Sequence, residues 1–93
     1  MLLVRNPDVE AAPLKDELLL YCSKTSKFFV MNDTAAFLWQ QLGSPASEEQ
    51  LADGLRSAFA PVSAEQALED VRRTVKEMLA NELIRAQDAP AAD

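Results

Sequence analysis

The sequence predicts a small α+β domain in which three antiparallel strands are followed by three helices. Two observations support this fold class. The spacing of apolar residues changes from strand-like to helical at Asn32, and the pattern Ser-x-x-Gln, typical of a helix start, occurs at Ser47 and again at Ser63. The 93 residues suffice for one such domain, which we place at residues 1–85. We expect residues 86–93, which are rich in Ala, Asp and Pro, to form a disordered C-terminal tail.

The strands are predicted in the first third of the chain. Residues 9–12 alternate in polarity between Pro7 and Pro13, as expected of a short edge strand. Residues 17–22 form the second strand, and because apolar side chains occur on both of its faces, we expect each face to be covered. Four polar residues then predict a hairpin turn into the third strand, residues 27–31.

The first helix is predicted to begin at Asn32, whose side chain can accept a hydrogen bond from a free N–H group of the first turn. Its apolar stripe brings Trp39, the largest side chain of the protein, to the face that looks back at the strands. The helix should end near Gly43, which suits a left-handed conformation. The residues of the stripe are Ala35, Leu38, Trp39 and Leu42.

Two further helices complete the domain. The second should run from Ser47 to a stop at Pro61, and Gly54 in its middle should weaken it by about 1 kcal/mol relative to Ala. The third begins at Ser63 and is the longest. The apolar stripes are Leu51, Ala52, Leu55, Ala58 and Phe59 in the second helix, and Leu68, Val71, Val75, Met78 and Leu79 in the third.

Composition excludes several kinds of function. The chain has no His and a single Cys22, so the usual zinc and transition-metal sites and an intramolecular disulfide cannot be built, and we expect no metal or cofactor. We interpret Cys22 as a small core side chain. The net charge of −6 repels nucleic acid and anionic membranes. No apolar stretch approaches the roughly 20 residues that cross a bilayer, and we expect no signal peptide and a cytoplasmic location.

The predicted elements have the architecture of a winged helix-turn-helix, and the residues at the junction resemble a known family. The pattern Phe29-Val30-Met31-Asn32, then Thr34-Ala35-Ala36, Leu38-Trp39 and Leu42 is similar to the Leu-Asn-x-x-Ala-x-x-Ile-Trp centre of the PqqD-like proteins, the recognition elements for precursors of ribosomally made, modified peptides. The resemblance extends over residues 9–84. Two positions depart from it: Met31 stands where Leu is usual, and Glu82 stands where Gly is common. We therefore expect Asn81 to be the left-handed residue at the end of the third helix.

The resemblance implies a stand-alone, non-catalytic protein that holds the leader segment of a precursor peptide and presents it to a modifying enzyme, for example a radical S-adenosylmethionine enzyme. The leader would be added as a strand on residues 27–31, in the cleft with the third helix. Carried over by position, Lys27, Phe28, Phe29 and Val30 would pair with the leader. The opposite wall would consist of Leu68, Val71, Arg72, Val75 and Lys76. No nucleic acid or membrane partner is implied, and the protein would be a monomer or a weak dimer through its strand edge.

Several of these residues allow more than one interpretation. Arg72 and Lys76 lie on one flank of the apolar stripe, where they could form a cationic rim for a leader with apolar anchors among Asp and Glu. Alternatively they are a solvated helix face, with Glu69 paired to Arg72 or Arg73. Of Phe28 and Phe29, one must enter the core, because neighbouring residues of a strand face opposite sides. The other is free to line the cleft.

Phe37 lies nearly opposite the stripe of the first helix, so we expect its ring to face away from the core. It could be a docking point for the modifying enzyme or for a second copy, or it could pack against the N-terminal arm.

Three other classes of function are less well supported. A winged-helix DNA-binding regulator would use Arg72, Arg73 and Lys76 as its recognition surface, and it is the main alternative, although the overall acidity opposes it. An acyl carrier would need a modifiable Ser in an Asp-Ser-Leu sequence, which is absent. An enzyme would need catalytic groups in a cleft, and the chain has no His and no Gly-rich phosphate loop.

Overall fold

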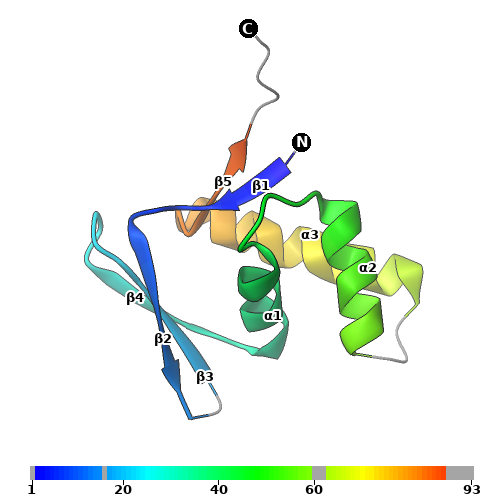
Figure 1. The fold of residues 1–93 in the computed structure, drawn as a ribbon, viewed down its shortest axis with the longest axis horizontal. Helices are drawn as coiled ribbons and strands as arrows, with labels where there is room; N and C mark the ends of the chain where they lie inside the picture. The colour runs from blue at the N-terminus through cyan, green and yellow to red at the C-terminus, as the bar shows by residue number, and fades with distance from the viewer. Residues whose placement is uncertain (1, 16, 60–62, 88–93) are drawn as a thin grey trace, which may run out of the picture.

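The computed structural model describes residues 2–15, 17–59 and 63–87. Its elements follow one another along the chain as five strands and three helices (Figure 1). They are β1 (Leu2–Arg5), β2 (Val9–Leu14), β3 (Glu17–Cys22), β4 (Lys27–Met31), α1 (Asp33–Gln41), α2 (Glu48–Ala58), α3 (Ala64–Ala80) and β5 (Ile84–Gln87). The predicted α+β order of strands followed by three helices is confirmed.

The main sheet is the predicted antiparallel meander, in the order β2-β3-β4. Both β3 and β4 have the predicted bounds, and Leu20 of β3 lies opposite Phe29 of β4. The first predicted strand is longer than expected, because β2 continues through Pro13 to Leu14. A proline is tolerated there since β2 is an edge strand, where its missing N–H group need not pair with a neighbour.

A second, two-stranded sheet was not predicted. It joins the two ends of the described chain, with β1 antiparallel to β5 and Leu2 opposite Gln87 (Figure 1). The expectation of a disordered tail is therefore wrong for Ala86 and Gln87, whose backbone belongs to β5. The rest of the predicted tail, residues 88–93, lies outside the described residues, as does the predicted helix stop at Pro61.

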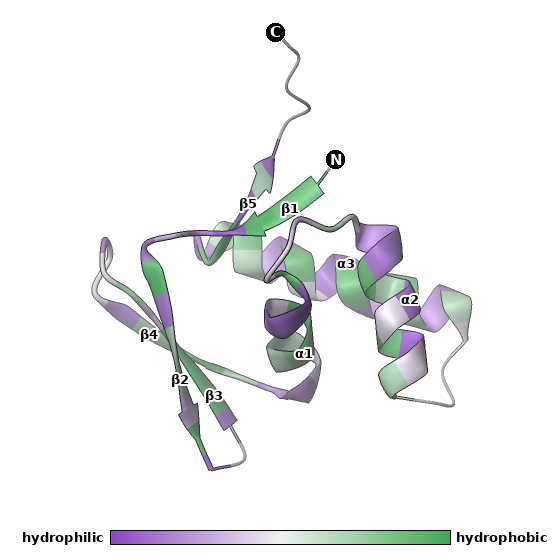
Figure 2. Cartoon of the chain, viewed as in Figure 1, coloured by the Kyte–Doolittle hydropathy of each residue, from purple (hydrophilic) through white to green (hydrophobic). Residues whose placement is uncertain are grey.

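The core lies between the helices and the inner face of the main sheet. Leu20 and Cys22 enter it from β3, while Leu38 and Trp39 enter it from α1. In α2 and α3 the predicted stripes supply the buried side chains apart from Ala67, which was not predicted. Of the predicted residues, Ala58 and Phe59 are exposed, and Leu68 and Leu79 are only partly buried. Hydrophobic residues run along β3 and into β4 (Figure 2). None of the described helices is both long enough and apolar enough to cross a membrane.

The predicted helix starts are confirmed at the level of single hydrogen bonds. The Asn32 Oδ1 atom accepts from the N–H of Ala35 at 2.8 Å. Ser47 forms a reciprocal capping box with Gln50, and the Ser63 hydroxyl oxygen accepts from the N–H of Gln66 at 3.1 Å. Each bond satisfies a backbone donor that the helix itself leaves without a partner, so these boundaries are encoded locally.

The helix ends differ from expectation. Gly43 does not have a positive φ, and the N–H of Gly43 instead donates to the Gln40 carbonyl at 3.2 Å, which tightens the last turn into a 3₁₀ form. At the end of α3 the left-handed residue is Glu82 (φ 60°), while Asn81 has φ −93°. The N–H of Glu82 donates to the Leu79 carbonyl and that of Leu83 to the Met78 carbonyl, which together form a Schellman motif.

Arg5 joins β1 to the end of α1. Its Nε and Nη2 atoms donate to the Trp39 carbonyl at 2.9 and 2.6 Å, and its guanidinium carbon lies 4.6 Å from the centroid of the Trp39 ring. The side chain thus satisfies a carbonyl that α1 leaves without a helical partner and also stacks on the ring. This contact ties α1, the helix that follows β4 directly, to β1.

Candidate functional site

The main sheet has two edges, and they differ in their chemistry. At one edge, β2 contains Pro13, which has no N–H group and so cannot donate a main-chain hydrogen bond to an added strand. At the other edge, β4 pairs with β3 on one side only, and its sequence from Lys27 to Met31 contains no proline. The edge of β4 can therefore accept a further extended chain.

A pocket of about 100 Å³ lies between the end of β4 and the C-terminal half of α3. Its floor contains the side chains of buried Met78 and Ala35 together with half-buried Met31. The remaining lining residues are Val30, Asn32, Thr74, Glu77, Asn81 and Leu83. The pocket is far smaller than the roughly 300–1,000 Å³ of small-molecule sites, so it suits a single side chain.

The two phenylalanines of β4 divide as the alternation predicts. Phe29 is half-buried and packs against the core, whereas Phe28 is 64% exposed on the opposite face of the sheet, where its ring centroid lies 4.7 Å from that of Tyr21. Val30 is 57% exposed on the same outer face.

The expectation that both faces of β3 are covered is wrong, because Leu19 and Tyr21 on this outer face are only partly buried. Lys27 begins β4 and is exposed.

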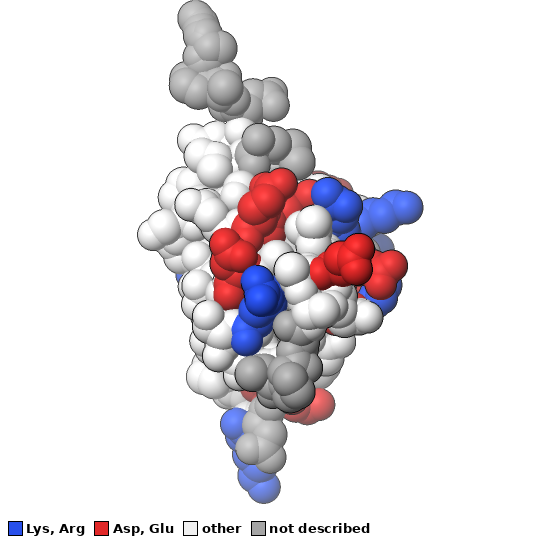
Figure 3. All heavy atoms as spheres, turned by 90° about the vertical axis from the view of Figure 1, so that its right-hand side faces the viewer, with Lys and Arg blue, Asp and Glu red and all other residues white. Residues whose placement is uncertain are grey.

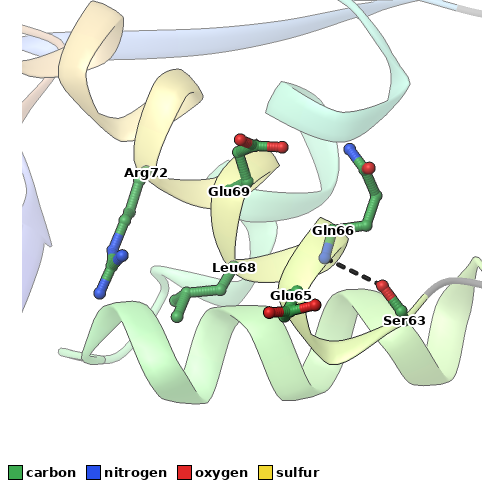
Figure 4. A pocket seen from close by; sticks show the side chains of 6 residues that line it. All are labelled: Ser63, Glu65, Gln66, Leu68, Glu69 and Arg72. Carbon is green, nitrogen blue, oxygen red and sulfur yellow. Dashed lines mark hydrogen bonds between the residues drawn. The ribbon is translucent and has the colours of Figure 1, made fainter.

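The structure divides the residues of the predicted wall on α3 between the core and the flank of the helix near α2. Val71 and Val75 are buried in the core, at 0% and 2% exposure, and cannot contact a peptide without a rearrangement. Leu68 and Arg72 line a separate, open hollow of about 650 Å³ near the start of α3 (Figure 4). Arg72 Nε lies 3.7 Å from Glu48 Oε1 of α2, so this flank faces α2 and not β4.

Lys76 is exposed and follows Arg72 by one helical turn. It does not line the pocket beside β4. The cationic rim that the sequence predicted for the cleft is therefore absent from that pocket, whose described lining residues include no Lys or Arg.

The residues of α3 that do face β4 were missed. Thr74, Glu77 and Asn81 lie on the other flank of the apolar stripe, and they share the pocket with Met31 and with Met78 of the stripe itself. A helical wheel identifies this flank as readily as the one with Arg72 and Lys76. It does not indicate which of the two is turned toward β4, since that depends on how α3 packs against the rest of the domain.

Phe37 corrects another expectation. Its ring is half-buried between α1 and α2, at a right angle to the ring of Phe59 with 5.5 Å between the centroids. A Cβ atom built at Gly54 would lie 3.5 Å from Phe37 Cζ. The ring therefore packs against α2 and the core and does not face away from the core. A docking role for Phe37 stays a prediction.

Among the described residues, the remaining charged and reactive groups give no sign of a second kind of site. Arg73 donates to Asp70 at 2.9 Å, and on the face in Figure 3 acidic side chains lie among the basic ones. In the described part of the chain, no three His, Cys, Asp or Glu side chains come together as a metal would require. Hydrogen bonds from Thr25 lower the pKa of the Cys22 thiol, but this side chain is fully buried, which confirms its interpretation as a core residue.

Comparison with known proteins gave one family and two solved structures. The family model described as coenzyme PQQ synthesis protein D (PqqD) matches residues 17–84. The structure titled "TbiB1 in Complex with the TbiA(beta) Leader Peptide" superposes with a TM-score of 0.79 at 19% identity, covering 92% of this chain and 99% of that one. A second, "Lasso peptide synthetase B1 complexed with the leader peptide", has a TM-score of 0.76 at 23% identity and covers 90% and 98%. No curated protein sequence matches.

Proposed function

Since the chain belongs to the PqqD family, we propose that it is a non-catalytic protein that binds the leader segment of a ribosomally made precursor peptide and presents it to a modifying enzyme. The free edge of β4, with a side-chain pocket beside it, is the observation that carries the proposal. Both similar structures were solved with a leader peptide, which supports the same class of ligand for this fold.

The leader would bind as an added strand on β4. Main-chain hydrogen bonds to the free edge supply affinity that is independent of sequence, and pockets for alternate side chains supply selectivity. One half of the leader side chains would point toward α3 and its pocket, and the other half would continue the outer face that carries Phe28 and Val30. The predicted contacts of Lys27, Phe28, Phe29 and Val30 with the leader are retained in this proposal.

The wall opposite the leader is revised. We assign it to Thr74, Glu77, Met78 and Asn81 in place of Leu68, Arg72 and Lys76. The former share a pocket with β4, whereas the latter do not line it, and Arg72 lies beside Glu48 of α2. The buried Val71 and Val75 support that wall from within the core.

An amide NMR titration with a synthetic leader of a precursor peptide encoded nearby tests the proposal. Amides of β4 and of residues 74–81 should shift, while those of β2 should not. A second series carries an N-methyl group at one leader backbone position at a time. Binding should weaken at alternate positions only, because every second N–H of an added strand points to its neighbour. Equal effects at all positions, or shifts confined to other elements, would exclude strand addition.

The DNA-binding alternative is tested in the same way with duplex DNA. It predicts shifts on the Arg72–Lys76 face of α3 and no response to the leader. Two features oppose it: Arg72 and Arg73 each lie beside a carboxylate, and the net charge is −6.

A further inference from the structure

The pocket between β4 and α3 has one charged group, and its sign is negative. Of the described residues that line it, Glu77 alone is ionisable, and no salt bridge joins its carboxylate to another described residue. The other acidic side chain on this flank, Asp70, lies two turns earlier and already bonds with Gln66 and Arg73. Glu77 is exposed, so its carboxylate is available to a ligand.

The buried residues that line the pocket are apolar, and its exposed lining residues are polar except for Val30. Met31, Met78, Ala35 and Leu83 supply flexible or small apolar surface. Asn32 is committed to the cap of α1, since its Oδ1 accepts from Ala35, whereas Thr74 and Asn81 stand beside Glu77 on α3. An apolar depth with an anionic rim fits a side chain that has a methylene stem and a cationic head.

We propose that this pocket receives a lysine or arginine side chain of the bound leader, with its methylenes against Met31 and Met78 and its cation on the Glu77 carboxylate. This inference rests on the proposed function and defines its selectivity. The ion pair is formed at the edge of a protein whose net charge is −6, so the long-range field also favours a basic segment. The position of the leader residue is fixed by the added strand, because only alternate residues point toward α3.

The proposal reverses the selectivity that the sequence predicted. A cationic rim formed by Arg72 and Lys76 would favour Asp and Glu in the leader, but neither side chain lines the pocket beside β4. Arg72 and Lys76 therefore serve as matched controls: they are charged, exposed residues of the same helix, outside the pocket.

Fluorescence anisotropy with a labelled synthetic leader tests this inference. Each Lys or Arg of the leader is replaced in turn by norleucine, which keeps the stem and removes the charge. Each peptide is then measured against the wild-type protein and against Glu77→Gln. One replacement should weaken binding to the wild type about 10-fold and leave binding to Glu77→Gln nearly unchanged. Arg72→Gln and Lys76→Gln should bind all peptides as the wild type does.

Charge reversal completes the test. A leader with Glu at the identified position should bind Glu77→Lys more tightly than it binds the wild type. If the wild type binds the leader but every replacement has the same effect on Glu77→Gln as on the wild type, this inference fails and the proposed function stands. If the wild type binds no leader, both fail. Circular dichroism of Glu77→Gln and Glu77→Lys verifies that these exposed substitutions leave the fold intact.

Discussion

The side-chain amide of Asn6 donates a hydrogen bond of 2.7 Å to the main-chain carbonyl of Glu82, which joins the turn after β1 to the turn that ends α3. Two further bonds reinforce the junction: the N–H of Asn6 donates to the Leu83 carbonyl at 3.0 Å, and Asn6 Oδ1 accepts from the N–H of Asp8 at 2.9 Å. Asn6 is the one buried polar residue among the described residues, and both ends of its amide have partners. The C-terminal end of α3, which lines the pocket, is thereby held by the N-terminal segment.

Asn6→Ala should lower the free energy of unfolding by about 1–3 kcal/mol, because it removes two partly buried hydrogen bonds and leaves the Asp8 N–H and the Glu82 carbonyl without these partners. Ser23→Ala is the control, since the Ser23 hydroxyl also bonds to this region, at the Asp8 carbonyl, but is exposed to water. Its effect should stay below about 0.5 kcal/mol. The free energies of unfolding of the two variants are measured by urea denaturation. Equal losses in the two variants would contradict a special role for Asn6.

Glu82→Gly should stabilise the protein by about 0.5–1 kcal/mol. Glu82 has a left-handed conformation, which costs an L-residue about 1–2 kcal/mol, and glycine removes this cost. Part of the gain is offset, because glycine has more conformational freedom to lose from the unfolded chain. The bond from Asn6 is retained, since it ends on the backbone. Glu82→Ala removes the same side chain without relieving the backbone, so thermal unfolding should show a higher Tm for the Gly variant only.

Gly54→Ala should also stabilise, by about 0.5–1 kcal/mol, through the higher helix propensity of alanine. The added Cβ would lie 3.5 and 3.6 Å from two carbons of the Phe37 ring, which is ordinary van der Waals contact. Gly43→Ala is the comparison, because Gly43 follows α1 and gains no propensity. A loss of stability in Gly54→Ala would indicate that the α1–α2 contact is tighter than these distances imply.

Phe37→Ala should cost about 1–2 kcal/mol of unfolding free energy, less than a fully buried phenylalanine, since the ring is half-buried. Phe28→Ala, which changes a largely exposed ring, should cost less than 1 kcal/mol. The stability of both variants is measured first by urea denaturation. Association with the modifying enzyme is then measured under conditions in which both variants are folded. An unchanged stability of Phe37→Ala would restore the idea of a ring dedicated to docking.

The parts of the fold that were predicted correctly are those encoded by neighbours in sequence. Asn32, Ser47 and Ser63 each bond to a residue three positions later, and the β3–β4 hairpin joins strands separated by four residues. The short strands β1 and β5 were missed because each has four residues and its partner lies about 80 positions away, so no local pattern marks the pair.

The candidate site shows the same division. The position of β4 as an open edge follows from the order of the strands, and it was predicted. Which flank of α3 faces β4 depends on the rotation of the helix about its own axis as it packs against α2. The contact of Arg72 with Glu48 shows this rotation in the structure, and no local sequence pattern predicts it. The family resemblance identified the helix but not its rotation about its own axis, so the prediction included Arg72 and left out Glu77, which lines the pocket beside β4.

The pairing of β1 with β5 brings Leu2 and Gln87 into register, so the two ends of the described chain leave the domain side by side. A module built in this way can be inserted into a surface loop of another protein, with a short connection on each side, and neither strand needs to move. Its ends can equally be joined to each other and a new break made in the turn between β3 and β4. The domain could therefore be inserted into a host enzyme by protein engineering, which would add the free edge of β4 to that enzyme.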